Sequence, residues 1–177
     1  MTPTLREDAG VTGAGRFIDV VVEIPRGSRN KYEYDHHRGV IKLDRRLFSA
    51  TVYPADYGFI PDTLGEDGDP LDALVMLDDP TFPGCWVSCR PVGVFWMEDD
   101  KGPDAKIICV PAGDSRWDTT QEIEDVPGPL LAEIEHFFEV YKMLEPDKHS
   151  NTRGYEGTAA AWAEIDEALA RYRPPST

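Results

Sequence analysis

Three aspartates, Asp67, Asp69 and Asp72, lie within six residues of one another, and Gly68 and Pro70 separate them. Glycine and proline disfavour a regular helix or a central strand, so these carboxylates are expected on one turn. Two carboxylates ~5 Å apart repel by roughly 3 kcal/mol at an effective dielectric of ~20, a cost that a bound cation removes. Oxygen ligands favour Mg²⁺, Mn²⁺ or Ca²⁺. The segment therefore indicates a divalent-metal site; a solvated acidic turn is the alternative that these residues alone leave open.

Charge is distributed unevenly along the chain, whose formal net charge is −15. Residues 26–46 carry seven basic and three acidic side chains, whereas residues 62–104 carry eleven acidic and two basic ones. A cationic block beside an anionic one suits a site where metal ions and phosphate groups meet. The strongly acidic total argues against a general nucleic-acid binder, which needs a basic face.

Length and composition predict one folded domain over residues 17–177, preceded by a flexible extension at residues 1–16. The extension lacks the apolar segment of a secretory signal, and no apolar run approaches the ~18 residues of a membrane span. The three cysteines, Cys85, Cys89 and Cys109, lack zinc-type spacing. They are expected to be reduced, which favours a cytoplasmic location.

Hydrophobic periodicity predicts several short strands followed by two helices. The strands are expected at residues 17–24, 31–34, 40–43, 71–77, 86–97 and 106–110. Pro91 and Gly93 predict a bend or bulge within the fifth of these. Apolar residues at helical spacing predict helices from about Pro129 to Leu144 and from Thr158 to Tyr172. This order predicts an α+β, mainly-β fold, namely a five-stranded OB-like β-barrel core with two outer α-helices.

Several short motifs, each with an ordinary structural explanation when taken alone, follow one another in a specific order. They are Glu23-Ile24-Pro25, Lys31-Tyr32-Glu33, Asp44-Arg45, Tyr53-Pro54 with Asp56-Tyr57-Gly58, Asp67-Gly68-Asp69-Pro70-Leu71-Asp72, Asp99 with Asp104-Ala105-Lys106, and His136-Phe137-Phe138 with Tyr141-Lys142. In this order they closely resemble the family I soluble inorganic pyrophosphatases, especially bacterial and actinobacterial members, over residues 19–144. The resemblance implies an enzyme that hydrolyses inorganic pyrophosphate to two orthophosphates by metal-activated water.

The resemblance also implies a role for each matching residue. The expected metal ligands are Glu23, Asp67, Asp72, Asp99 and Asp104, with Mg²⁺ as cofactor and Mn²⁺ or another divalent metal as a substitute. Asp69 would accept the proton of the attacking water. The expected substrate-binding residues are Lys31, Glu33, Arg45, Tyr53, Tyr57, Lys106, Tyr141 and Lys142. Of these, Arg45, Tyr141 and Lys142 would also act in catalysis, by stabilising charge on the leaving phosphate.

Two positions depart from the pattern of bacterial relatives. Asp100 stands where glutamate is common, and Val140 stands where a second histidine is common. In bacterial relatives the helix around Val140 lies at a subunit contact, so the resemblance implies a homohexamer. Pyrophosphate is the expected partner, and neither nucleic acid nor a membrane is expected.

Other functions fit these residues less well. An EF-hand loop fails on register, because Leu71 occupies the fifth ligand position and Asp72 the glycine position. A barrel that binds oligonucleotides would need a basic and aromatic surface. A non-catalytic β-barrel module that binds divalent metal is an alternative. A metal-dependent nucleoside polyphosphate hydrolase is another, although the chain has no Walker-type loop.

Overall fold

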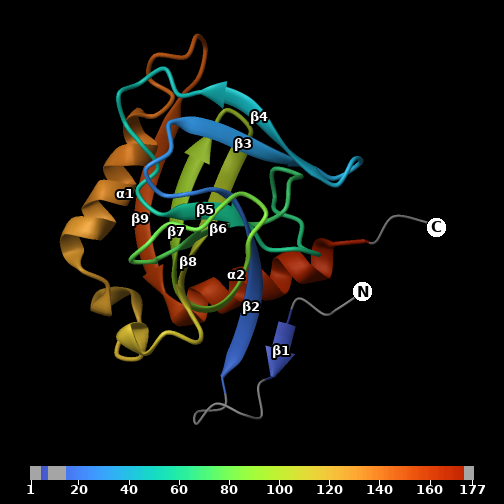
Figure 1. The fold of residues 1–177 in the computed structure, drawn as a ribbon, viewed down its shortest axis with the longest axis vertical. Coiled ribbons are helices and arrows are strands. Elements are labelled where there is room, and N and C mark those ends of the chain that lie inside the picture. Colours follow the sequence, from blue (N-terminus) through green and yellow to red (C-terminus); the bar gives the residue numbers. More distant parts are fainter. Residues whose placement is uncertain (1–4, 8–14, 174–177) are drawn as a thin grey trace.

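The computed structural model describes residues 5–7 and 15–173, which form a mainly-β structure with two long helices (Figure 1). The coarse fold predicted from the sequence is therefore confirmed. The strands are β1 Leu5–Glu7, β2 Arg16–Ile24, β3 Asn30–Asp35, β4 Val40–Arg46, β5 Asp56–Phe59, β6 Asp72–Val75, β7 Trp86–Asp99, β8 Gly102–Pro111 and β9 Ser150–Gly157. The helices are the short η1 Ser115–Trp117 and η2 Ile123–Asp125 and the longer α1 Gly128–Val140 and α2 Thr158–Arg171.

The extension expected at residues 1–16 lies partly outside the described residues, which omit 1–4 and 8–14. Within it, β1 pairs antiparallel with β2, and Arg16 is already the first residue of β2. Among the described helices, none is long and apolar enough to cross a membrane.

Five strands pair in a closed ring, in the order β2, β5, β6, β8, β7 and back to β2. Four of these pairings are antiparallel, and β6 pairs parallel with β8. β9 extends the sheet beyond β7, and β3 and β4 form a separate hairpin. The parallel pairing matters for the site, because it places Asp72 directly opposite Lys106.

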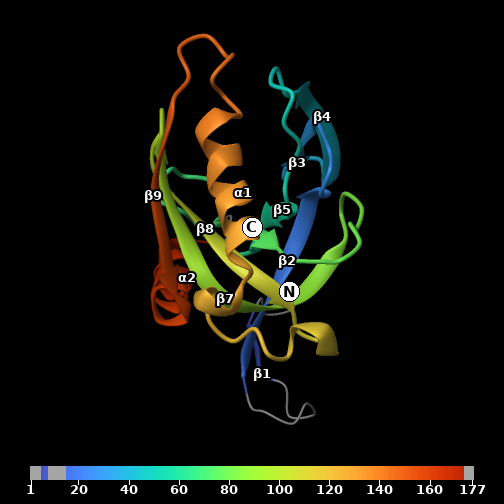
Figure 2. The same cartoon turned by 90° about the vertical axis from the view of Figure 1, so that its left-hand side faces the viewer.

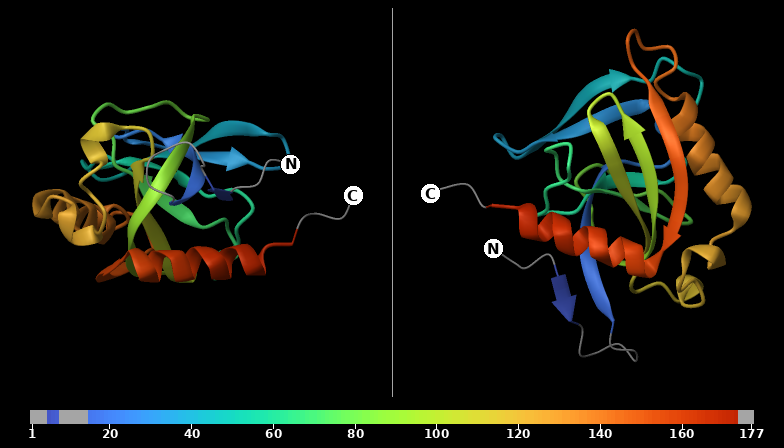
Figure 3. Two further views of the ribbon diagram at one scale, coloured as in Figure 1. Left: turned by 90° about the horizontal axis from the view of Figure 1, so that it is seen from below. Right: turned by 180° about the vertical axis from the view of Figure 1, so that it is seen from behind.

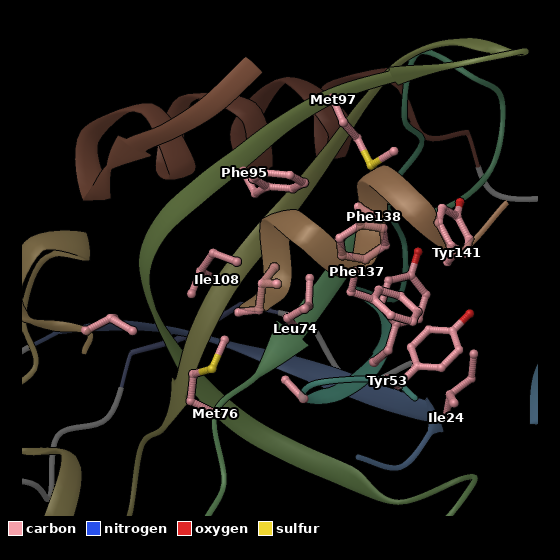
Figure 4. Close-up of a cluster of buried hydrophobic side chains, with 14 of the residues drawn as sticks. Ile24, Tyr53, Leu74, Met76, Phe95, Met97, Ile108, Phe137, Phe138 and Tyr141 are labelled. Carbon is pink, nitrogen blue, oxygen red and sulfur yellow. The ribbon is translucent and has the colours of Figure 1, made fainter. Parts of the chain in front are cut away.

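Alternating residues on the strands feed two apolar clusters, as the two-residue period of a strand requires. On β8, Ile108 and Val110 belong to the cluster that includes Phe137 and Phe138 of α1 (Figure 4). Ile107 and Cys109 belong to the cluster that includes the α2 residues Ala161, Ile165 and Ala168. The two helices therefore cover different faces of the strands (Figures 2 and 3).

Some boundaries differ from those predicted. The predicted bulge in β7 is confirmed, since the register with β8 shifts between Pro91 and Gly93. The predicted end of the first long helix at Leu144 is wrong: α1 ends at Val140. Met143 and Leu144 are exposed, so no apolar contact holds a further helical turn. β5 and β9 were not predicted.

Gly58 on β5 is required by the close approach of β2. A Cβ atom at Gly58 would lie 1.9 Å from the carbonyl oxygen of Val21. We expect Gly58→Ala to lower the free energy of unfolding by roughly 2–4 kcal/mol, because one of two paired backbones must move. Urea denaturation measures this change. Gly113→Ala is the matched control, since its Cβ would meet nothing within 4 Å. Equal stability of the two variants would contradict this packing.

Candidate functional site

A cleft of about 580 Å³ lies between the β3–β4 hairpin and the segment that follows α1. These two walls rise on opposite sides at one end of the molecule (Figure 2). The floor includes the turn that carries Asp67 and Asp69, together with residues of β6 and β8. The predicted site residues that line the cleft are Glu23, Lys31, Glu33, Arg45, Tyr57, Asp67, Asp69, Asp72, Asp99, Asp104, Lys106, Tyr141 and Lys142.

The acidic turn has the irregular backbone that its sequence predicts. Gly68 adopts a φ of +89°, which favours glycine, and the Asp69 N–H donates to Asp67 Oδ1 at 3.1 Å. The N–H of the buried Leu71 donates to Thr63 Oγ1 at 2.9 Å. The turn is thereby fixed to the core while its carboxylates face the cleft.

Lys106 is the most deeply buried charged group of the cleft, at 1% exposure. Its Nζ lies 3.0 Å from Asp72 Oδ2, 2.9 Å from both oxygens of Asp104 and 3.0 Å from Tyr57 Oη. The Tyr57 hydroxyl also donates to Asp72. Burial acts to lower the pKa of Lys106, but the carboxylates of Asp104 and Asp72 raise it above its ordinary value. Lys106 is therefore held as a cation.

The carboxyl groups of Asp104 and Glu23 are disfavoured as anions by their surroundings. Burial raises the pKa of Asp104 to about 6, although Lys106 opposes this. Burial also raises the pKa of Glu23 to about 7, although Glu23 Oε1 accepts a 2.6 Å hydrogen bond from the Tyr34 N–H. A further cation nearby would stabilise the ionised form of both carboxyl groups and lower their pKa values.

Asp99 is held by donors on both of its oxygens. Lys142 Nζ lies 2.6 Å from Oδ2, and the Lys101 N–H donates to Oδ1 at 2.8 Å. Burial acts to raise the pKa of Asp99, but these hydrogen bonds outweigh it and the pKa lies below its ordinary value. The hydrogen bond from Lys148 lowers the pKa of Asp100 to about 2. Asp100 therefore carries a negative charge at neutral pH, as a glutamate at this position would.

On the opposite wall, Arg45 is oriented by carboxylates. Its Nε and Nη2 lie 3.1 and 2.8 Å from Glu145 Oε1, and its Nη1 lies 2.5 Å from Asp44 Oδ2. Lys31 pairs with Glu33 and lies 3.5 Å from Asp44. Sequence reasoning gave Glu145 no role, and only its position three residues after Lys142 could have suggested one.

Tyr53 is the predicted site residue that does not line the cleft. It is buried in the core, where its ring centroid lies 4.7 Å from that of Phe137 and 5.5 Å from that of Tyr57 (Figure 4). Its position supports Tyr57, which does reach the cleft.

The donor set of the cleft fits a hard divalent cation, since it consists of carboxylate oxygens. Asp67, Asp72 and Asp104 also line a small adjoining cavity of about 60 Å³. Within residues 5–7 and 15–173, no three acidic, histidine or cysteine side chains are already gathered as a metal site. Instead, Lys106 Nζ lies on Asp72 and Asp104, Lys142 Nζ on Asp99 and Lys101 Nζ on Asp69, so these carboxylates already attract positive charge. Carboxylates, lysines and an arginine that line one cleft have the chemistry that divalent cations and phosphate groups require.

Comparison with known proteins points to enzymes that act on a phosphate compound, in agreement with the chemistry of the cleft. The inorganic pyrophosphatase family model matches residues 20–173. An inorganic pyrophosphatase from Streptomyces coelicolor is 55% identical over 88% of this chain and 96% of its own, and one from Methanosarcina acetivorans is 58% identical over 86% and 90%. The crystal structure of inorganic pyrophosphatase from Thermus thermophilus superposes with a TM-score of 0.87 at 49% identity, covering 96% of this chain and 99% of that one. The chain belongs to the inorganic pyrophosphatase family, and the resemblance seen in the sequence is confirmed.

The burial of Lys106 gives a stability prediction. In metal-free buffer we expect Lys106→Met to lower the free energy of unfolding by about 3–5 kcal/mol, because it removes the buried cation that the partly buried Asp72 and the largely buried Asp104 share. Added Mg²⁺ should reduce the loss by neutralising the same carboxylates. Chemical denaturation with and without Mg²⁺ measures both effects. The matched control is Lys148→Met, which removes an exposed ion pair with Asp100 and should cost about 0–1 kcal/mol. Similar losses in the two variants would contradict the importance of the buried ion pairs.

Proposed function

We propose that this protein hydrolyses inorganic pyrophosphate to two orthophosphates with Mg²⁺ as its cation. The observation that carries the proposal is the single cleft in which five candidate cation ligands face the candidate phosphate-binding side chains. Membership of the inorganic pyrophosphatase family supports the same reaction. The relatives do not favour a non-catalytic metal-binding module or a nucleoside polyphosphate hydrolase.

The cation would be held by the carboxylates of the cleft. The proposed ligands are Glu23, Asp67, Asp72, Asp99 and Asp104. Their oxygens accept Mg²⁺ and also Mn²⁺, so other divalent ions are expected to substitute for Mg²⁺. When bound, divalent cations neutralise phosphate oxygens and make water more acidic.

Asp69 is proposed to accept the proton of the attacking water. Its side chain is 59% exposed and lies in the cleft, whereas Asp72 and Asp104 are held by Lys106. Among the described residues, the Asp69 carboxylate has one side-chain partner, the exposed Lys101. It is therefore accessible to a water molecule beside a bound phosphate.

The basic side chains are proposed to bind the substrate and to stabilise the leaving phosphate. Arg45 offers a planar fork of donors, while Lys142 offers a compact charge, so the two are not interchangeable. Tyr141 is mostly buried beside Lys142 and would donate its hydroxyl proton in a hydrogen bond to phosphate. Lys31 and Lys106 would contact further phosphate oxygens, with Glu33, Tyr53 and Tyr57 in support.

Family membership also supports finer proposals about the whole protein. We infer that the protein is a homohexamer and is located in the cytoplasm. Each subunit would consist of one domain over residues 17–177, preceded by an N-terminal extension. The five-strand ring is proposed to be an OB-like barrel, because its pairing closes on itself as a barrel requires.

Orthophosphate release from pyrophosphate tests the proposed function. The purified protein should release orthophosphate with Mg²⁺, and this release should stop when a chelator removes the metal. Asp69→Asn should lower turnover roughly 10²–10⁴-fold, because the substitution removes the proton acceptor from an exposed site.

Glu66→Gln is the matched control for Asp69→Asn, because it removes one negative charge from the same turn. Glu66 itself does not line the larger cleft. It should retain most of the wild-type turnover. Circular dichroism shows whether each variant is folded. A folded wild-type protein that releases no orthophosphate with Mg²⁺ or Mn²⁺ would refute the function. Full activity in Asp69→Asn would refute only the role of Asp69.

A further inference from the structure

Lys101 lies at the tip of the hairpin that joins β7 to β8. Asp99 pairs with Gly102, so Asp100 and Lys101 form a two-residue connection. Gly102 has a φ of +119°, and the Lys101 N–H donates to Asp99 Oδ1 at 2.8 Å. The backbone of Lys101 is therefore fixed against one of the proposed cation ligands.

The side chain of Lys101 extends from this tip to the acidic turn. Its Nζ lies 2.5 Å from Asp69 Oδ2, and the two side chains are 57% and 59% exposed. Both residues line the large cleft. Lys101 thus places an ammonium group on the carboxylate proposed to accept the proton, yet it belongs to none of the motifs that the sequence matched.

We propose that Lys101 is an internal counter-cation that occupies Asp69 until divalent cations enter the cleft, and that it thereby weakens their binding. This inference rests on the proposed function, in which the same cleft receives Mg²⁺ and pyrophosphate. Lys101 acts through Asp69 and through the charge of the cleft, so it is a positioning residue.

Lys101 is the most exposed of the five lysines that line the cleft in the described part of the chain: its side chain is 57% exposed, against 43% for Lys148 and 22% for Lys31. Lys106 is buried among two carboxylates and Tyr57, and Lys142 is largely buried against Asp99. Lys101 has one carboxylate partner and a long, exposed side chain, and such an exposed ion pair is weak because water screens it. Its ammonium can therefore leave Asp69 at little cost.

The charge of Lys101 nevertheless opposes a divalent cation in the same cleft. Repulsion between a single and a double positive charge a few ångströms apart is of the order of RT even when water screens it strongly. Loss of this charge, together with release of Asp69 from its ion pair, should strengthen cation binding. The expected change is modest because the site is open to solvent.

Calorimetric titration of Mg²⁺ into substrate-free protein tests the inference directly. Lys101→Gln should lower the Mg²⁺ dissociation constant roughly threefold to tenfold. Lys101→Arg keeps the charge and should retain the wild-type value. Lys42→Gln is the matched control, because Lys42 is 56% exposed, pairs with Asp35 and does not line the cleft. Its Mg²⁺ affinity should equal that of the wild-type protein.

Pyrophosphate hydrolysis at varied Mg²⁺ gives a second readout. Lys101→Gln should exceed the wild-type rate at limiting Mg²⁺, and this advantage should shrink as Mg²⁺ approaches saturation. Unchanged Mg²⁺ affinity in folded Lys101→Gln, or an equal gain in Lys42→Gln, would overturn the inference. An inactive wild-type protein would instead refute the proposed function, and the calorimetric result would still decide whether Lys101 opposes cation binding.

Discussion

The buried ammonium of Lys106 is the interaction on which the site depends. Asp72 and Asp104 each lie within 3.0 Å of it, and an uncompensated charge at this depth would be costly. The parallel pairing of β6 with β8 sets Asp72 opposite Lys106, and the two-residue period of β8 places Asp104 on the same face as Lys106. The strand pairing and the charge pairing therefore support the same register.

The cleft is continuous with the apolar core rather than a separate addition to it. The face of β8 that carries Lys106 continues into Ile108 and Val110, which pack in the cluster that α1 covers. Lys106 Nζ also lies 5.3 Å from the ring centroid of Tyr57 and 5.1 Å from that of Phe138, where aromatic faces favour a cation. Helix α1 thus helps to hold the central charge of the site, although no residue of the helix itself lines the cleft.

The fold was predictable where the local sequence has a clear period. β2, β7 and both long helices have strong hydrophobic patterns, and Pro91 and Gly93 predicted the bulge in β7. β9 has the polar sequence SNTRGYEG, so no local pattern indicates a strand, and it forms by pairing with the long β7. Of the fourteen site residues that the motifs predicted, thirteen line one cleft in the structure. The contact between Arg45 and Glu145 could not be predicted, because it joins two elements distant in sequence.

Ion pairs within the cleft couple the binding of cations to the binding of phosphate in the proposed function. Lys142 and Lys106 are both proposed phosphate ligands, and both lie on carboxylates proposed to hold cations. A divalent ion on Asp99 or Asp104 competes with the lysine for the same oxygens, and each lysine gains freedom to face an anion. Phosphate binding to that lysine must then strengthen cation binding by the same factor, because linkage between two sites is reciprocal. The cleft can therefore keep its buried lysines paired without metal and still assemble around a highly charged substrate.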